Sequence, residues 1–148
     1  MIAVIECVKG GRQRYEFING EMTYMFDVKK PWVENYGFIE DTLQVDGDAL
    51  DCYIISDRKY EVGSKVSVGA VASIVCFDEG KRDDKMVCID VACKISRRRI
   101  DRLLKRLVHT IRKYKRGTVV LGVRRSPDWL YFELLKCHEY KKLFSKGE

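Results

Sequence analysis

Several features are scarce in this 148-residue chain, and each scarcity excludes a class of protein. No apolar run approaches the ~20 residues that a membrane-spanning helix needs, and the apolar start of the chain is too short for a signal peptide. The two histidines lie far apart and no two of the six cysteines have CxxC spacing, so neither a zinc site nor a disulfide framework is indicated. We therefore expect a cytoplasmic protein with reduced, mostly buried thiols and no membrane partner.

The composition is that of a globular protein. Hydrophobic residues make up 46% of the chain and aromatic residues 11%, which excludes a disordered polypeptide, and the length suits a single domain over residues 1–148. The net charge is +6, but the excess is local, because residues 97–116 hold ten of the 28 Lys and Arg against one acid, Asp101. This basic segment could steer an anionic substrate or contact nucleic acid.

Alternating or continuous apolar residues predict a mainly β structure. Glycine-containing turns separate the segments, and Asn19-Gly20 favours a tight hairpin between the second and third of them. Their even spacing predicts a closed or nearly closed antiparallel sheet. The expected strands are Ile2–Val8, Arg14–Ile18, Met22–Phe26, Asp51–Ser56, Lys65–Phe77, Lys85–Cys93 and Thr118–Val123.

Two helices are expected to cover this sheet. Apolar residues from Ile100 to Ile111 recur every three or four positions, which predicts a helix that starts near Ser96 with a basic outer face. A second helix is expected from Ser126-Pro127-Asp128, where Ser can cap the helix and Pro suits its first turn, towards Phe144. The fold class is therefore α+β, mainly β.

The segment DGDALD, residues 46–51, places three aspartates around a glycine just before an apolar strand. Asp46 and Asp48 are alternate residues of an extended chain and can face one cavity, and a turn can bring Asp51 beside them. Close carboxylates favour a hard cation such as Mg²⁺, Mn²⁺ or Ca²⁺. An EF-hand loop is excluded because residue 53 is Tyr, and an acidic surface turn remains the alternative.

A second acidic segment, FDEGKRDDK at 77–85, offers Asp78, Asp83 and Lys85. Taken alone, it is typical of a charged hairpin tip. Together, the two segments resemble family I of the soluble inorganic pyrophosphatases, in which a DGDPxD loop and a later DxxxxDxK segment build a multi-metal site. The likeness extends to NYGFIEDTL at 35–43, RYE at 14–16, Glu6 and the YK pair at 114–115. It covers about Glu6 to Lys115 and is most specific across Asn35–Asp51.

The resemblance implies a five-stranded Greek-key, OB-like antiparallel barrel that hydrolyses pyrophosphate with several Mg²⁺ ions, Mn²⁺ being an alternative. It implies Asp48 as general base and Glu6 in an outer role. The implied metal ligands are Asp46, Asp51, Asp78, Asp83 and Glu16. The implied phosphate-binding residues are Arg14, Tyr36, Lys85, Tyr114 and Lys115, of which Tyr36 and Lys115 are also assigned to catalysis.

The chain departs from the family pattern in three places. Arg14 stands where Lys is usual, and Ala49 replaces the usual Pro. The arginine expected between Glu16 and Tyr36 has no clear counterpart, and Lys29 or Lys30 is the nearest basic candidate.

Three alternatives stay open: a nucleic-acid-binding module that uses the basic helix, a hydrolase of another phosphoanhydride, and a relative with little activity. We expect pyrophosphate as substrate, no nucleic-acid partner and a homo-oligomer.

Overall fold

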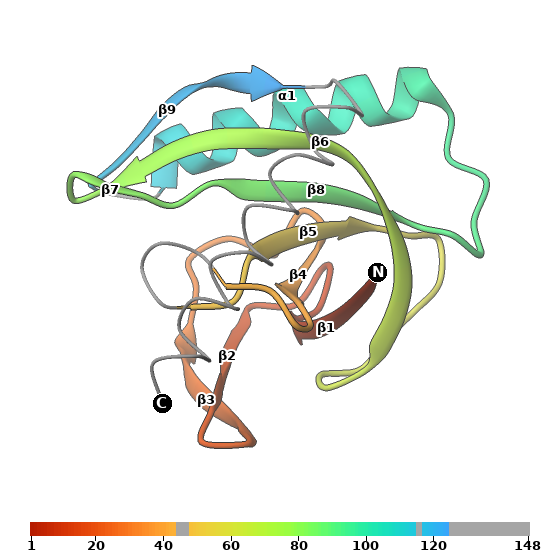
Figure 1. Cartoon of the computed structure of the whole chain (residues 1–148), viewed down its shortest axis with the longest axis vertical. Helices are drawn as coiled ribbons and strands as arrows, with labels where there is room; N and C mark the ends of the chain where they lie inside the picture. The colour runs from red at the N-terminus through yellow and green to blue at the C-terminus, as the bar shows by residue number, and fades with distance from the viewer. Residues whose placement is uncertain (44–47, 115–116, 125–148) are drawn as a thin grey trace, which may run out of the picture.

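The computed structural model describes residues 1–43, 48–114 and 117–124 (Figure 1). Five strands form a closed ring, in which each strand pairs with the next and the last pairs with the first. In ring order they are β1 (Ile2–Cys7), β4 (Asn35–Ile39), β5 (Asp51–Ile55), β8 (Lys85–Asp90) and β6 (Lys65–Asp78). Only one pair in the ring, β5 with β8, is parallel. The predicted five-stranded, mainly antiparallel barrel is confirmed.

Within the described residues, four more strands extend the barrel. β2 (Gln13–Ile18) and β3 (Glu21–Asp27) form the predicted hairpin, and both turn residues, Asn19 and Gly20, have positive φ as a type I′ turn requires. The far end of β6 pairs with the short β7 (Lys81–Arg82) and with β9 (Thr118–Arg124). Figure 1 shows the β2–β3 hairpin at one end of the molecule and β9 at the other.

The predicted basic helix is α1 (Arg97–Tyr114), which lies along β6 and β9 (Figure 1). Ser96 caps it: its Oγ accepts a hydrogen bond from the Arg99 N–H at 3.2 Å. Leu104, Leu107 and Ile111 form its buried face. The second predicted helix, from 126 towards 144, lies outside the described residues.

The apolar core has two parts because β5 and its neighbours are covered on both faces. Cys52 and Ile54 point into the barrel interior, whereas Tyr53 and Ile55 alternate with them and pack beneath α1. This explains why the strand reads as a continuous apolar run. Among the described cysteines all five thiols are free, as predicted, and four are buried; Cys137 lies outside the described residues.

Two strands were not predicted, β4 and the two-residue β7. A glycine inside β4 weakens its strand signal. The structure shows why glycine is there: a Cβ on Gly37 would lie 1.8 Å from the Val4 carbonyl oxygen of the adjacent β1. The close approach of two backbones therefore requires this residue.

The strand expected to reach Cys93 ends at Asp90 instead. The Asp90 carboxylate accepts hydrogen bonds from the Ala92 N–H at 3.0 Å, from Ser56 Oγ at 2.8 Å and from the Tyr60 hydroxyl. The side chain thus competes with the strand ladder for the following backbone and turns the chain. No described helix is long and apolar enough to cross a membrane.

A buried carboxylate precedes β4. Glu34 has no exposed surface, and neither of its carboxyl oxygens has a hydrogen-bond partner in the described structure. Lys9 Nζ lies 3.5 Å from Oε1, and Arg99 and Arg106 of α1 add positive potential. Burial nevertheless dominates and raises the pKa of Glu34.

Candidate active site

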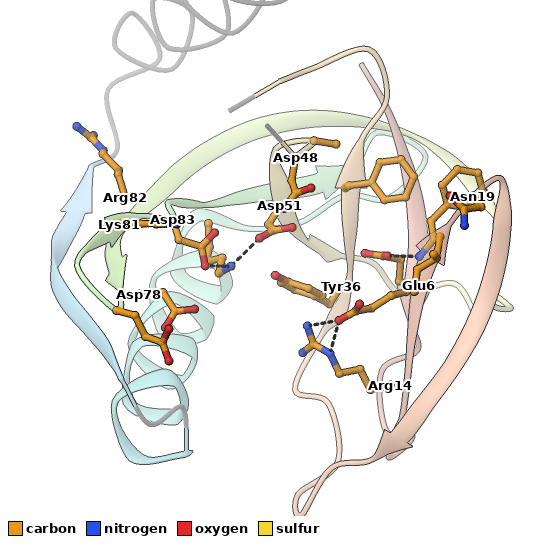
Figure 2. Close-up of a pocket in the computed structure, with 17 residues that line it drawn as sticks. Glu6, Arg14, Asn19, Tyr36, Asp48, Asp51, Asp78, Lys81, Arg82 and Asp83 are labelled. Atoms are coloured by element: carbon orange, nitrogen blue, oxygen red, sulfur yellow. Dashed lines mark hydrogen bonds and ion pairs between the residues drawn. The ribbon is translucent and has the colours of Figure 1, made fainter. Parts of the chain in front are cut away.

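A cavity of about 820 Å³ opens between the β2 side of the barrel and the β6–β7 hairpin (Figure 2). Asp48 and Asp51 line it beside Tyr36, as do Arg14 and Lys85. All six acidic residues that the sequence singled out within the described ranges therefore share this cavity: Glu6, Glu16, Asp48, Asp51, Asp78 and Asp83. Asp46 and Lys115 lie outside the described residues.

The sheet brings the two acidic segments together. β5 and β8 run parallel with Cys52 opposite Met86, so the residues that precede them, Asp51 and Lys85, meet at the same end of the sheet. Lys85 Nζ donates to Asp51 Oδ2 at 2.6 Å and to Asp83 Oδ2 at 2.7 Å. Segments 34 residues apart in sequence thus form one ion cluster.

The cluster is largely removed from water. The Lys85 side chain is 3% exposed, against 28% for Asp51 and 20% for Asp83. Burial raises the pKa of Asp51, and the nearby Asp83 raises it further although Lys85 opposes both. Burial alone would lower the pKa of Lys85, but the two carboxylates raise it above its ordinary value, so Lys85 stays charged.

The opposite wall carries Arg14 and Glu6 (Figure 2), and Glu16 lines the cavity in contact with Arg14. The Arg14 guanidinium contacts Glu16 Oε1 through Nε at 3.3 Å and Nη2 at 3.2 Å. Glu6 accepts a hydrogen bond from the Phe17 N–H at 2.9 Å. Burial raises the pKa of Glu6 to about 7, with Asp51 and Glu16 adding to the effect and Arg14 opposing it.

Tyr36 forms the floor between the two walls. It is 4% exposed, stacks on Trp32 with centroids 5.4 Å apart and meets Tyr53 edge-on at 4.9 Å. Lys85 Nζ lies 5.7 Å from its ring centroid. Burial, followed by the charge of Asp51, raises the pKa of Tyr36 well above its ordinary value, so its hydroxyl keeps its proton and can donate to an anion.

The segment 77–85 is both a charged hairpin tip and a wall of the cavity. Glu79 and Gly80 have positive φ and close the turn between β6 and β7. Arg82 donates to Asp84 Oδ2 at 2.9 Å, and Asp84 Oδ1 accepts the Cys76 N–H at 3.2 Å. Besides the expected residues, Lys81 and Arg82 line the cavity, and sequence reasoning did not select them.

Tyr114 is not brought to this cavity. It lines a second one of about 710 Å³, together with Lys29, Lys30 and Trp32. Arg14 lines both cavities and so stands at the boundary between them. The two lysines suggested as replacements for the missing arginine therefore share a cavity with two of the expected phosphate-binding residues.

The acidic side chains of the cavity are the candidate donors for a metal ion. In the described ranges, no three acidic, histidine or cysteine side chains converge tightly enough to hold one ion. The Lys85 ammonium supplies the positive charge between Asp51 and Asp83. The available donors are carboxylate oxygens that face an open cavity, and such donors fit a hard divalent cation rather than a soft metal.

A five-stranded barrel with a cavity of carboxylates, lysine, arginine and buried tyrosine defines a protein suited to binding anions together with hard cations. The sequence profile of the inorganic pyrophosphatases matches residues 3–119, and the chain belongs to this family. The resemblance found in the sequence is thereby confirmed.

Individual relatives agree with this assignment. The inorganic pyrophosphatase of Mycoplasma pneumoniae is 26% identical over 156 residues, covering 96% of this chain and 84% of that protein. The inorganic pyrophosphatase of Methanosarcina acetivorans is 30% identical over 133 residues, covering 80% of this chain and 79% of that protein. The structure of the Thermus thermophilus inorganic pyrophosphatase superposes with a TM-score of 0.85 at 23% identity, over 96% of this chain and 91% of that one. This last likeness shows the fold.

Proposed function

We propose that this chain hydrolyses inorganic pyrophosphate to two orthophosphates and that it uses Mg²⁺, with Mn²⁺ as an alternative. The observation that carries the proposal is the shared cavity: it gathers the six predicted acids with Lys85, Arg14 and Tyr36 in a chain of the inorganic pyrophosphatase family. Pyrophosphate carries up to four negative charges, so a catalyst must neutralise it before a nucleophile can approach phosphorus.

The metal ions would be held by Asp51, Asp78 and Asp83, with Asp46 and Glu16 completing the ligand set. When bound, such ions neutralise substrate charge and lower the pKa of water towards neutrality. Asp51 and Asp83 keep enough exposure to the cavity to serve as ligands. Glu6 is proposed as an outer support of this set, and its carboxylate is held in place by the hydrogen bond that it accepts from the Phe17 N–H.

Asp48 is proposed as the general base. It is exposed and lines the cavity, so its carboxylate can accept a proton from the attacking water without first being uncovered. The neighbouring Asp51 is only partly exposed, with 28% of its side chain accessible, and it accepts a hydrogen bond from Lys85 Nζ. The two proposed roles, proton acceptor for Asp48 and metal ligand for Asp51, rest on this difference in exposure.

The phosphoryl groups would be bound by Arg14 and Lys85 and by the Tyr36 hydroxyl. Tyr114 lines the second cavity and is proposed to reach the same substrate where Arg14 joins the two cavities, and Lys115 is proposed as a further contact. Either Lys29 or Lys30 is proposed to supply the charge of the missing arginine, because both line the second cavity and Arg14 lines both cavities. A single domain, a cytoplasmic location and a homo-oligomer stay predictions.

Phosphate release from pyrophosphate tests the proposal, measured with excess Mg²⁺ and with EDTA. We expect activity only with the divalent ion. Asp48→Asn should keep the fold and lower the catalytic rate by about 10²–10⁴-fold, the usual contribution of a general base. The matched control is Asp57→Asn, because Asp57 lines neither cavity and pairs with Arg99 at 2.5 Å.

Two results would contradict the proposal. Equal rates of pyrophosphate hydrolysis by Asp48→Asn and Asp57→Asn at saturating Mg²⁺ would contradict the assignment of Asp48 as general base. A wild-type protein that releases no phosphate with any divalent metal would be a relative without this activity.

A further inference from the structure

Lys81 differs from the other cations that line the cavity, because among the described residues it has no carboxylate partner. Lys85 is engaged by Asp51 and Asp83, Arg14 by Glu16 and Arg82 by Asp84. Within the described residues Lys81 takes part in no ion pair, although it lines the same cavity. An incoming anion must compete with a carboxylate for each of the other three cations, whereas no carboxylate of the described residues competes for Lys81.

The backbone of the hairpin fixes where Lys81 lies. In the backbone ladder between β6 and β7, Lys81 lies opposite Asp78. A hydrogen bond from the Glu79 N–H to the Gly117 carbonyl, at 3.1 Å, holds the turn. A second, from the Asp83 N–H to the Cys76 carbonyl at 3.0 Å, holds the residues that follow it. The Lys81 side chain therefore projects from a position that does not depend on a long loop.

Extended-chain alternation sets the direction of the side chains. Asp83 and Lys85 contact one another across one intervening residue, and so do Arg82 and Asp84. Side chains two residues apart share a face, so Lys81 belongs to the row of Asp83 and Lys85. Figure 2 shows Lys81 on the same wall as Asp78 and Asp83, facing the wall that holds Arg14 and Glu6.

We propose that Lys81 is an outer binding residue for the phosphoryl groups of the substrate, at the entrance of the cavity and on the wall opposite Arg14. This inference rests on the proposed function, since it takes the substrate to be pyrophosphate. Lys81 is exposed, so it contributes to capture and affinity rather than to the chemical step. Its position between Gly80 and Arg82 makes the hairpin tip a determinant of how strongly this chain binds small polyanions.

The test compares Lys81→Gln with Lys59→Gln. Both changes remove one exposed lysine charge, but Lys59 lines neither cavity. We expect Lys81→Gln to raise KM for magnesium pyrophosphate about 3–10-fold and to leave kcat within about twofold, because a rim cation acts on binding. Lys81→Arg should restore KM, and Lys59→Gln should not change it.

Salt provides a second readout. The Lys81→Gln effect on KM should shrink as ionic strength rises from about 0.05 M to about 0.5 M, because an exposed charge is screened. Equal KM changes in Lys81→Gln and Lys59→Gln would overturn the inference, since a general field of the protein would then explain them. A loss of kcat without a change in KM would overturn it as well.

Failure of the proposed function can be distinguished from failure of the inference about Lys81. Binding of methylenediphosphonate, which is not hydrolysed at its bridging carbon, can be measured by calorimetry on the full chain in the presence of Mg²⁺. If wild-type protein proves inactive, weaker binding of this probe to Lys81→Gln than to Lys59→Gln still supports the role of Lys81. Equal binding of the probe to both variants overturns it.

Discussion

Replacing Lys85 by methionine tests the ion cluster at the centre of the cavity. Methionine keeps much of the length and apolar surface of lysine but removes the charge that lies 2.6 Å from Asp51 and 2.7 Å from Asp83. The two carboxylates would then face one another without a cation. Removing one partner of a buried ion pair costs about 3–5 kcal/mol, and because both carboxylates keep some exposure we expect the lower end, about 3 kcal/mol.

Urea unfolding in EDTA measures this loss. For a slope of about 2 kcal/mol per molar urea, a loss of about 3 kcal/mol lowers the midpoint by about 1.5 M. Excess Mg²⁺ should recover more of the midpoint in Lys85→Met than in wild type, because the ion then neutralises two carboxylates that have no other partner.

The matched control is Lys65→Met. Lys65 also pairs with a carboxylate at 2.6 Å, that of Glu40, but its side chain is 66% exposed, so the midpoint should hardly move. A Lys85→Met midpoint in EDTA equal to that of wild type would refute the reasoning, because the cluster would then contribute nothing net to stability.

Three further predictions concern single residues. Gly37→Ala should destabilise the fold by about 3 kcal/mol or more, as its Cβ meets the Val4 carbonyl, whereas Gly122→Ala on β9, with nothing within 4 Å, should be nearly neutral in the same urea titration. Glu34→Gln should stabilise the protein by about 1 kcal/mol at pH 8. Burial raises the pKa of Glu34 above 4.5, so the folded state loses stability as pH rises through that raised value, and urea midpoints should show a smaller advantage of the variant at pH 5. Asp51→Asn should raise the Mg²⁺ concentration needed for half-maximal phosphate release, and an unchanged requirement would exclude Asp51 as a ligand.

Strands with period two and the helix with its apolar face could be predicted because their signals are local. The apolar spacing from Ile100 to Ile111 predicted a helix that starts near Ser96, and the structure adds that Ser96 caps it. β4 could not be predicted from alternation, because the Gly37 that weakens its signal is required by the backbone of β1, a contact between distant segments. The end of β8 was misplaced for a related reason: Asp90 binds the backbone of the turn and also side chains beyond β5.

The site shows the same division between local and long-range information. DGDALD alone fits a metal loop or an acidic turn equally well. The structure adds the parallel pairing of β5 with β8, which brings Asp51 to Lys85 and makes Asp48 and Asp51 part of the cavity wall. Nothing in the spacing of these segments predicts a parallel pair, so only the family resemblance could place the two segments together. The same resemblance gives no hint that Tyr114 lines a different cavity from Tyr36.

The segment 77–85 shows how one short stretch can serve the fold and the site together. A charged hairpin tip and a wall of a binding cavity look like competing interpretations while only the sequence is considered. The structure divides the residues by their alternation: Arg82 and Asp84 bind each other and the β6 backbone, which holds the tip, whereas Asp83 and Lys85 join the ion cluster. Arg82 also lines the cavity, but the two sets have separate partners, so a change in one need not disturb the other. Lys81 lies in the second set, so altering its charge should change anion binding while the hairpin keeps its hydrogen bonds.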